Sequence, residues 1–205
     1  MIVGILLFLI MTFIPIDHHI KSVLYFVVGI AVALFITKGK LNLLFKKPKL
    51  ADIKTILISV IAYFVLNGLI HNIVSLIPHH QDAGVNVALT NIPLLVVTAL
   101  QIFGEEVFRF MPFILVAYFV YKSTQNRKHA VLLGAVASLI IFGALHTSAY
   151  GSFLFAVVGI TIPAIALAYS YLKTKNIFVS YLVHLIIDFS LIMLFNLAPL
   201  VHVAT

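Results

Sequence analysis

The sequence predicts an all-α, polytopic membrane helix bundle of about seven transmembrane helices, and three observations lead to this fold class. The chain has 205 residues, of which 63% are hydrophobic and 9% charged, whereas soluble domains are about half apolar and a quarter charged. Its mean hydropathy is +1.19. Apolar runs recur along the whole sequence, and about 20 such residues cross a bilayer as a helix. We therefore expect residues 1–205 to form a single integral membrane domain without a large soluble part.

The first two apolar runs, residues 1–16 and 23–37, are each slightly short for a crossing. A signal peptide could explain the first run, but it has neither a basic start nor a small-residue cleavage site, so we expect a membrane helix. Five lysines follow between Lys38 and Lys49. Such a segment is typical of a cytoplasmic loop that lies against anionic lipid headgroups.

The division of the following apolar runs into membrane spans is less clear. Residues 55–77 predict a third span, followed by an outer loop around Asp82 that carries His79 and His80 but no Lys or Arg. Residues 87–121 would make a helix of about 52 Å, which is too long for one crossing. We expect a re-entrant or interfacial piece up to Gln101 and then a span to Tyr121. The last spans are expected at 130–147, 153–172 and 177–197.

The charge distribution sets the expected orientation. With seven spans and a cytoplasmic N-terminus, all of the 13 Lys and Arg residues except Lys21 and Arg109 lie on the cytoplasmic face, as the positive-inside rule requires. Lys21 then lies in an outer loop and Arg109 within a span. The net charge of +7 therefore comes from basic residues that lie against anionic lipid headgroups. Membrane lipid is the expected partner of these residues, and nucleic acid is not.

Function is expected among the polar residues within the spans. The chain has no Cys, so thiol chemistry, disulfides and cysteine-bound metals are excluded. A charge at mid-bilayer costs about 2.5–3.5 kcal/mol and usually faces the bundle interior. The residues concerned are Asn67, His71, Asn72, Glu105, Glu106, Arg109, His146, His184 and Asp188.

Helical spacing groups these residues. Glu105 and Arg109 are four residues apart, as are His184 and Asp188, so each pair is expected on one helix face. Carboxylates, imidazoles and a guanidinium brought together from three helices suit proton-transfer chemistry. The alternative is that these residues only stabilise the fold, as buried polar pairs. For Asn67, His71 and Asn72, hydrogen bonding between helices is the expected role.

Three short patterns resemble the motifs of the CPBP family, which comprises CAAX-prenyl-protease-like and bacteriocin-processing intramembrane glutamic endopeptidases and includes Abi immunity proteins. These patterns lie in the family's order within residues 87–197 and read Gly104-Glu-Glu-Val-Phe-Arg109, Phe142-Gly-Ala-Leu-His146 and His184-Leu-Ile-Ile-Asp188. Their order makes the combination more specific than any one motif.

The first motif departs from the family pattern by one residue. The family has three residues between its Glu pair and Arg, and here only two intervene. Aligned on Arg109, the family's first Glu falls on Gly104 and its second on Glu105. Aligned on the Glu pair, Glu105 is the first Glu and Arg109 comes one residue early. One residue rotates a side chain by about 100° on a helix, so the two alignments imply different geometries.

The resemblance implies hydrolysis of a peptide within the membrane, without a cofactor. A Glu, for which we favour Glu105, and His146 would activate water, and His184 and Asp188 would stabilise the oxyanion. Arg109 would hold Glu105 or Glu106 by a charge-assisted bond. The expected substrates are CAAX-type or bacteriocin-type peptides, prenylated or free, at a bacterial plasma membrane.

Other functions remain open from the sequence. Glu105, His146 and His184 could supply three zinc ligands, but no His-Glu-x-x-His motif is present. Serine and aspartyl intramembrane proteases are disfavoured because Gly-x-Ser-Gly is absent and Asp188 is the only Asp expected within a span. A non-catalytic bacteriocin self-immunity or scaffold protein is the main alternative. A proton-coupled transporter is a third, weakened by the lack of an internal repeat.

Overall fold

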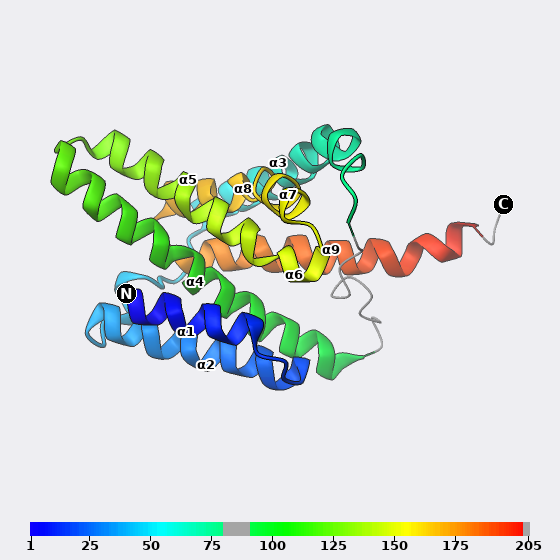
Figure 1. The fold of residues 1–205 in the computed structure, drawn as a ribbon, viewed down its shortest axis with the longest axis horizontal. Helices are drawn as coiled ribbons and strands as arrows, with labels where there is room; N and C mark the ends of the chain where they lie inside the picture. The colour runs from blue at the N-terminus through cyan, green and yellow to red at the C-terminus, as the bar shows by residue number, and fades with distance from the viewer. Residues whose placement is uncertain (80–90, 203–205) are drawn as a thin grey trace.

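The all-α fold class is confirmed. A computed structural model describes residues 1–79 and 91–202, and the regular structure within these ranges is helical (Figure 1). His80 and Asp82 of the expected outer loop lie outside the described residues. The principal helices are α1 (Ile2–Phe13), α2 (His18–Thr37), α3 (Leu50–Val74), α4 (Ile92–Thr124), α5 (Arg127–Leu145), α6 (Thr147–Tyr150), α7 (Phe153–Phe155), α8 (Ile165–Thr174) and α9 (Ile177–His202).

Several helices are long and apolar enough to cross a membrane. Among the described residues these are α2, α3, the segment Arg127–Tyr150 and the segment Ile177–Asn196. A fifth is obtained if Phe153–Ile160 and Ile165–Thr174, which meet at 43°, count as one span. The protein is therefore an integral membrane protein by length and composition, while the expected number of seven spans is not confirmed. Helix α1 is apolar but has only 12 residues.

The expected division of residues 87–121 at Gln101 is wrong, because α4 is one continuous helix of 33 residues. Asn91 caps its start by accepting a hydrogen bond from the Leu94 amide at 3.1 Å. Pro93 lies in the first turn, where a missing amide hydrogen costs nothing. The charged residues in the middle of α4 do not break it, since they are paired within the helix and with residues of α9, as described below.

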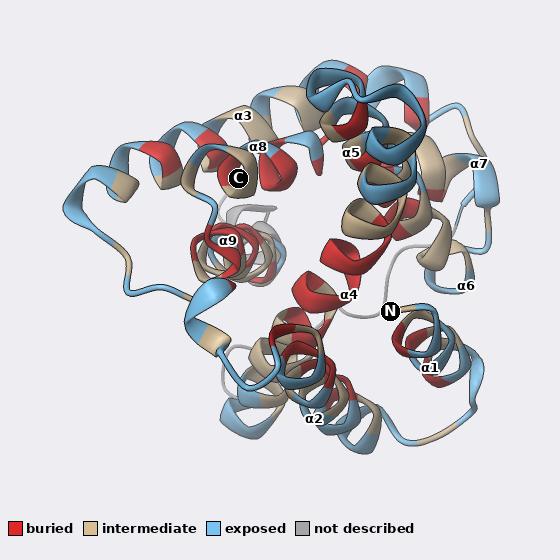
Figure 2. Cartoon of the chain, turned by 90° about the vertical axis from the view of Figure 1, so that its left-hand side faces the viewer, coloured by how far each residue is buried: buried red, intermediate tan, exposed pale blue. Residues whose placement is uncertain are grey.

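Helix α4 forms the centre of the bundle. Figure 2 shows its buried residues running through the middle, with α2, α5 and α9 around it. One apolar cluster joins α1, α2 and α4 through Phe8, Tyr25, Phe108 and Met111. A second joins α5, α8 and α9 through residues that include Leu139, Leu167 and Val183. The polar residues of α4 therefore lie between two apolar regions.

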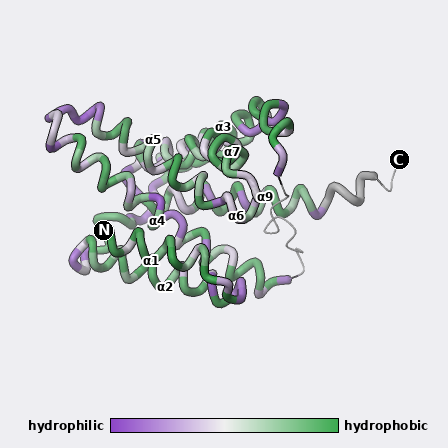
Figure 3. Tube along the Cα trace, viewed as in Figure 1, coloured by the Kyte–Doolittle hydropathy of each residue, from purple (hydrophilic) through white to green (hydrophobic). Residues whose placement is uncertain are grey.

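The lysine-rich segment lies at one end of the bundle. Figure 3 shows hydrophobic residues along most of the helices and hydrophilic residues at the turns of its left-hand end. There Asn176, just before α9, holds this segment through two hydrogen bonds: Lys46 N donates to its Oδ1 at 3.0 Å, and its Nδ2 donates to Lys46 O at 2.9 Å. The α4–α5 and α8–α9 turns are at the same end (Figure 1).

The segment between α5 and α8 departs from α-helical geometry. Residues Ala156–Ile160 (η3) form a π-helical turn, and Pro163 precedes the bend into α8. Thr161 Oγ1 donates a hydrogen bond of 3.1 Å to the Leu139 carbonyl on α5. Gly143 permits this approach, because a Cβ there would collide with Thr161 Oγ1.

Candidate active site

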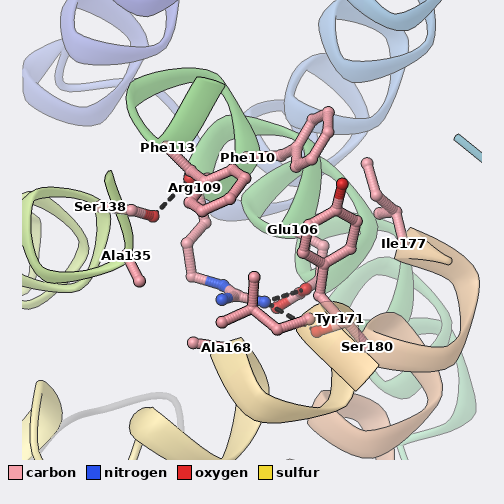
Figure 4. A pocket seen from close by; sticks show the side chains of 11 residues that line it. Glu106, Arg109, Phe110, Phe113, Ala135, Ser138, Ala168, Tyr171, Ile177 and Ser180 are labelled. Carbon is pink, nitrogen blue, oxygen red and sulfur yellow. Dashed lines mark hydrogen bonds and ion pairs between the residues drawn. The ribbon is translucent and has the colours of Figure 1, made fainter. Parts of the chain in front are cut away.

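The second glutamate of the first motif forms a buried ion pair. Arg109 donates from Nη2 to Glu106 Oε2 at 2.5 Å and from Nε to Glu106 Oε1 at 3.3 Å (Figure 4). Glu106 is 1% exposed and Arg109 is 6% exposed. Arg109 Nη2 also donates to Ser180 Oγ on α9 at 2.7 Å. Because a buried charge is costly unless paired and hydrogen-bonded, this arrangement explains how α4 carries both charges inside the bundle.

His184 of the third motif lies against the same glutamate. Its Nδ1 is 3.0 Å from Glu106 Oε1, and its Nε2 is 3.6 Å from Asp188 Oδ1 on the next turn of α9. An ionised carboxylate only accepts hydrogen bonds, so Nδ1–H donates to Glu106. This contact fixes the ring and leaves Nε2 facing Asp188.

Glu105, the first glutamate, lies in a different environment. It is half-buried and accepts a hydrogen bond of 2.7 Å from Gln101 Nε2, one turn earlier in α4. The amide of Gln101 is itself held from α2, because Ser22 Oγ donates to Gln101 Oε1 at 2.9 Å. Ser22 therefore orients the Gln101 amide so that its NH₂ group faces the Glu105 carboxylate.

The third polar group of the site is His146, at the C-terminal end of α5. Its Nδ1 lies 2.8 Å from the carbonyl oxygen of Phe142. A carbonyl accepts, so Nδ1 carries the hydrogen and Nε2 is the nitrogen with a lone pair in the neutral ring. The Phe142 ring contacts both histidines edge-on, with centroid distances of 4.8 Å to His146 and 5.9 Å to His184.

One cavity of about 530 Å³ joins these groups. Glu105, His146, His184 and Asp188 all line it, from α4, the end of α5 and α9. Its lining also includes residues of α1, α2 and α3: Thr12, His18, Lys21, Tyr25 and Tyr63. Its volume lies within the range of small-molecule binding sites. Four of the six predicted site residues are thus brought together in the lining of one cavity.

Arg109 lies outside this cavity. It lines a much smaller cavity of about 20 Å³ with Glu106, Phe110, Ser138 and Ser180 (Figure 4). Of the two glutamates expected as partners of Arg109, the guanidinium pairs with Glu106, three positions earlier, and not with Glu105. Two residues of α9 explain why Arg109 pairs with Glu106 and not with Glu105. Ser180 accepts a hydrogen bond from Arg109, and His184 contacts Glu106, which is enclosed.

Gly104, just before the Glu pair, is a point where α4 comes very close to α2. It packs against the backbone of Tyr25, and a Cβ at this position would collide with the Tyr25 carbonyl. No glutamate could occupy position 104 without moving α2. In this structure Arg109 pairs with Glu106 between residues i and i+3, while Glu105 faces a different environment.

Sequence reasoning missed several residues of the site. Ser22, Gln101 and Ser180 hold the charged groups, and Tyr63 and Lys21 line the cavity. Gln101 could have been noticed, since it lies four residues before Glu105 and therefore shares its helix face. For Asn67, His71 and Asn72, no side-chain hydrogen bond to another helix is present in the described part of the chain. Their expected role is not confirmed.

Among the described residues, no three His, Cys, Asp or Glu side chains are close enough together to hold an ion. Glu105, His146 and His184 therefore do not form the three-ligand set that the sequence left open.

The fold and the site define a class of protein: a helical membrane protein with a buried carboxylate, arginine and histidine cluster next to a cavity of about 530 Å³. Within this class, residues 87–190 match the family model described as type II CAAX prenyl endopeptidase Rce1-like. The match covers about half of the chain, and the chain belongs to this family of CAAX-type intramembrane proteases. Residues 1–39 match a model described as membrane protein. No curated protein and no solved structure matches the chain.

Proposed function

We propose that the protein is an intramembrane endopeptidase that hydrolyses a membrane-associated peptide in the large cavity, using water activated by Glu105 and His146. The observation that carries the proposal is that Glu105, His146, His184 and Asp188, which are distant in the sequence, line one cavity. A purely structural set of polar residues would be expected to be enclosed and paired, as Glu106 and Arg109 are.

The first step is attack by water on the scissile carbonyl. Glu105 is the general base in this mechanism, and the Gln101 amide orients its carboxylate. His146 has its Nδ1–H bound to Phe142 O, so Nε2 can accept a hydrogen bond from the same water. A positioned general base contributes about 10²- to 10⁴-fold to a rate. One water proton moves to Glu105, and the hydroxyl oxygen bonds to the carbonyl carbon.

The second step stabilises the resulting oxyanion and expels the amine. As an imidazolium between two carboxylates, His184 keeps its Nδ1–H on Glu106 and donates the hydrogen of Nε2, which lies 3.6 Å from Asp188 Oδ1, to the oxyanion. Preorganised donors of this kind are often the largest contribution to catalysis. The proton held by Glu105 then passes to the nitrogen of the leaving peptide as the C–N bond breaks. The products are a carboxylic acid and an amine, the acid then gives its remaining proton to the amine or to water, and the site returns to its starting state.

The substrate class follows from the family and the location. The family model names CAAX prenyl endopeptidases, and CAAX sequences lie at the C-terminus of lipid-anchored proteins. We therefore propose a peptide that is cleaved near its C-terminus and held in the membrane, either by a prenyl group or by its own apolar residues.

Cleavage assays with isosteric variants test the proposal. Wild type, Glu105→Gln and His146→Asn are purified and incubated with quenched peptides, free and farnesylated, with and without chelator. His129→Asn, an exposed histidine at the start of α5, is the matched control. We expect cleavage by wild type and His129→Asn, insensitive to chelator, and loss of about 10²-fold or more in the other two variants. Absence of cleavage by folded wild type would overturn the proposal in favour of a peptide-binding immunity or scaffold role.

A further inference from the structure

Lys21 is the exception in an otherwise consistent charge distribution. Of the 13 Lys and Arg residues, Arg109 is buried in the site and 11 others occur in or beside the turns at the lysine-rich end of the bundle. Lys21 alone is at the opposite end, in the first turn of α2. It is also the one Lys or Arg residue in the lining of the large cavity.

The ammonium group of Lys21 is positioned but not neutralised. Nζ donates to the Thr12 carbonyl at the end of α1, at 3.3 Å. An ammonium has three N–H donors, so others remain for a ligand. Asp17, the nearest acidic residue in sequence, is engaged in capping α2, because its Oδ1 accepts from the amides of His19 and Ile20. Within the described residues, no carboxylate forms an ion pair with Lys21.

Two carboxylates in the lining of the cavity would repel an anion. Glu105 and Asp188 both line it, and both are acidic. A carboxylate that enters a partly desolvated site is costly unless it is paired. Lys21 is the one Lys or Arg residue in the lining, so it can pair with a substrate carboxylate there, while His184 serves the oxyanion in the proposed mechanism.

The distance from Lys21 to Glu105 fits a short peptide end. Ser22, the neighbour of Lys21, contacts Gln101, and Tyr25 contacts Gly104, so α2 and α4 run side by side in the same direction. Gln101 precedes Glu105 by one helical turn, which is about 6 Å along the axis. Three extended residues span about 10 Å. A carboxylate at Lys21 would therefore lie between one and three residues from a peptide bond at Glu105.

We propose that Lys21 binds the C-terminal carboxylate of the peptide substrate and thereby sets the position of cleavage near the C-terminus. This inference rests on the proposed peptidase function of the same cavity. Lys21 is here a specificity-determining residue. It holds the C-terminal fragment of the peptide, which hydrolysis then releases.

The test compares peptides that differ only at their C-terminus. A farnesylated peptide with a free carboxylate and the same peptide as an amide are cleaved by wild type, Lys21→Met, Lys21→Arg and Lys122→Met. Lys122 is an exposed lysine near the end of α4, so Lys122→Met removes the same charge far from the cavity. We expect wild type, Lys21→Arg and Lys122→Met to prefer the free acid by about tenfold in kcat/KM, as for one charge-assisted bond. In Lys21→Met the preference should fall to about one.

Two results would overturn the inference. One is equal cleavage of acid and amide by wild type, and the other is an unchanged acid preference in Lys21→Met. A lipid phosphate could also bind Lys21, so the assay is repeated in bilayers with and without anionic lipid. The inference is overturned if Lys21→Met lowers cleavage only in bilayers with anionic lipid and the acid and the amide are cleaved alike. In that case Lys21 binds a lipid headgroup.

Failure of the peptidase function itself is distinguishable. If no variant cleaves either peptide, binding of the two fluorescently labelled peptides to wild type and Lys21→Met is measured instead. Tighter binding of the acid to wild type, lost in Lys21→Met, supports carboxylate recognition without hydrolysis. Equal binding of acid and amide by wild type overturns the inference.

Discussion

Glu105 and Glu106 are consecutive in α4 but their carboxylates belong to different environments. Glu105 faces the cavity and receives one hydrogen bond from Gln101, whereas Glu106 is enclosed between Arg109 and His184. Adjacent residues of an α-helix point about 100° apart, so one helix can supply a reacting group and its support. In the proposed mechanism Glu106 acts only through His184, as a positioning residue, and Glu105 contacts the attacking water.

The first prediction concerns the buried ion pair. Glu106→Leu and Arg109→Leu should each lower the free energy of unfolding by about 3–5 kcal/mol, because each leaves an uncompensated buried charge. The double variant Glu106→Leu/Arg109→Leu should lose clearly less than the sum of the two, since neither charge remains. Unfolding in detergent, followed by circular dichroism, measures all three. Additive losses would contradict the assigned pair.

The second prediction tests the close approach of α2 to α4 at Gly104. Gly104→Ala should destabilise the protein by about 1–3 kcal/mol, since its Cβ would meet the Tyr25 backbone. Gly68→Ala is the matched control in α3, where a Cβ has open space around it. There alanine should be neutral or stabilising by up to about 1 kcal/mol. Equal melting temperatures for the two variants would show that α2 does not approach α4 at Gly104.

The motif residues could be predicted from the sequence for two reasons. Each is a charged residue or a histidine within an apolar span, where it is costly, and each lies at helical spacing from another. Their assembly was expected on two grounds: a charged residue in a span turns inward, where other polar residues gather, and the three patterns resemble the motifs of one family. This reasoning led to the shared site of Glu105, His146, His184 and Asp188. It did not determine which glutamate Arg109 would hold, since this depends on Ser180 and His184 from α9.

The length of α4 was mispredicted for a related reason. Pro93 and the charged motif resemble interruptions when read along the chain, but Pro93 falls in the first helical turn and the charges find partners in α9. The π-helical turn at Ala156–Ile160 was also unpredictable, because nothing in its apolar sequence distinguishes it from an α-helix. Contacts between distant segments decide such features, as Thr161 and Leu139 illustrate.

The third prediction concerns Gln101 as a positioning residue for Glu105. Gln101→Met keeps the length of the side chain and removes the donor to the carboxylate. We expect kcat to fall by about ten- to a hundredfold, in line with the cost of a misplaced reacting group, with KM and the melting temperature nearly unchanged. Ser22→Ala should have a smaller effect in the same direction, since it loosens the Gln101 amide.

A double variant provides the control for this prediction. In Glu105→Gln, from which the base is already missing, the further change Gln101→Met should have no additional effect on residual turnover. If it lowers turnover by the same factor as in wild type, Gln101 does not act through Glu105. A rise in KM instead of a fall in kcat would place Gln101 in substrate binding.

The fourth prediction fixes the side of the membrane from which the cavity is reached. The exposed residues of its lining include His18 and Ser148, at the end of the bundle opposite the lysine-rich turns. By the positive-inside rule those turns are cytoplasmic, so we expect the N-terminus inside and the cavity open to the outer side. A chain without Cys allows a direct test with single cysteines.

Ser148→Cys and Ser123→Cys are a matched pair for this labelling. Both serines are exposed, Ser148 beside the cavity and Ser123 at the end of α4 near the lysine-rich turns. With a membrane-impermeant maleimide on intact cells, Ser148→Cys should react at once and Ser123→Cys only after permeabilisation. The reverse result would place the cavity on the cytoplasmic side, and the substrate would then be a peptide that reaches the membrane from within the cell. Because only one serine can be exposed to the outer medium under either orientation, the labelling pattern also determines from which side Lys21 would receive a substrate carboxylate.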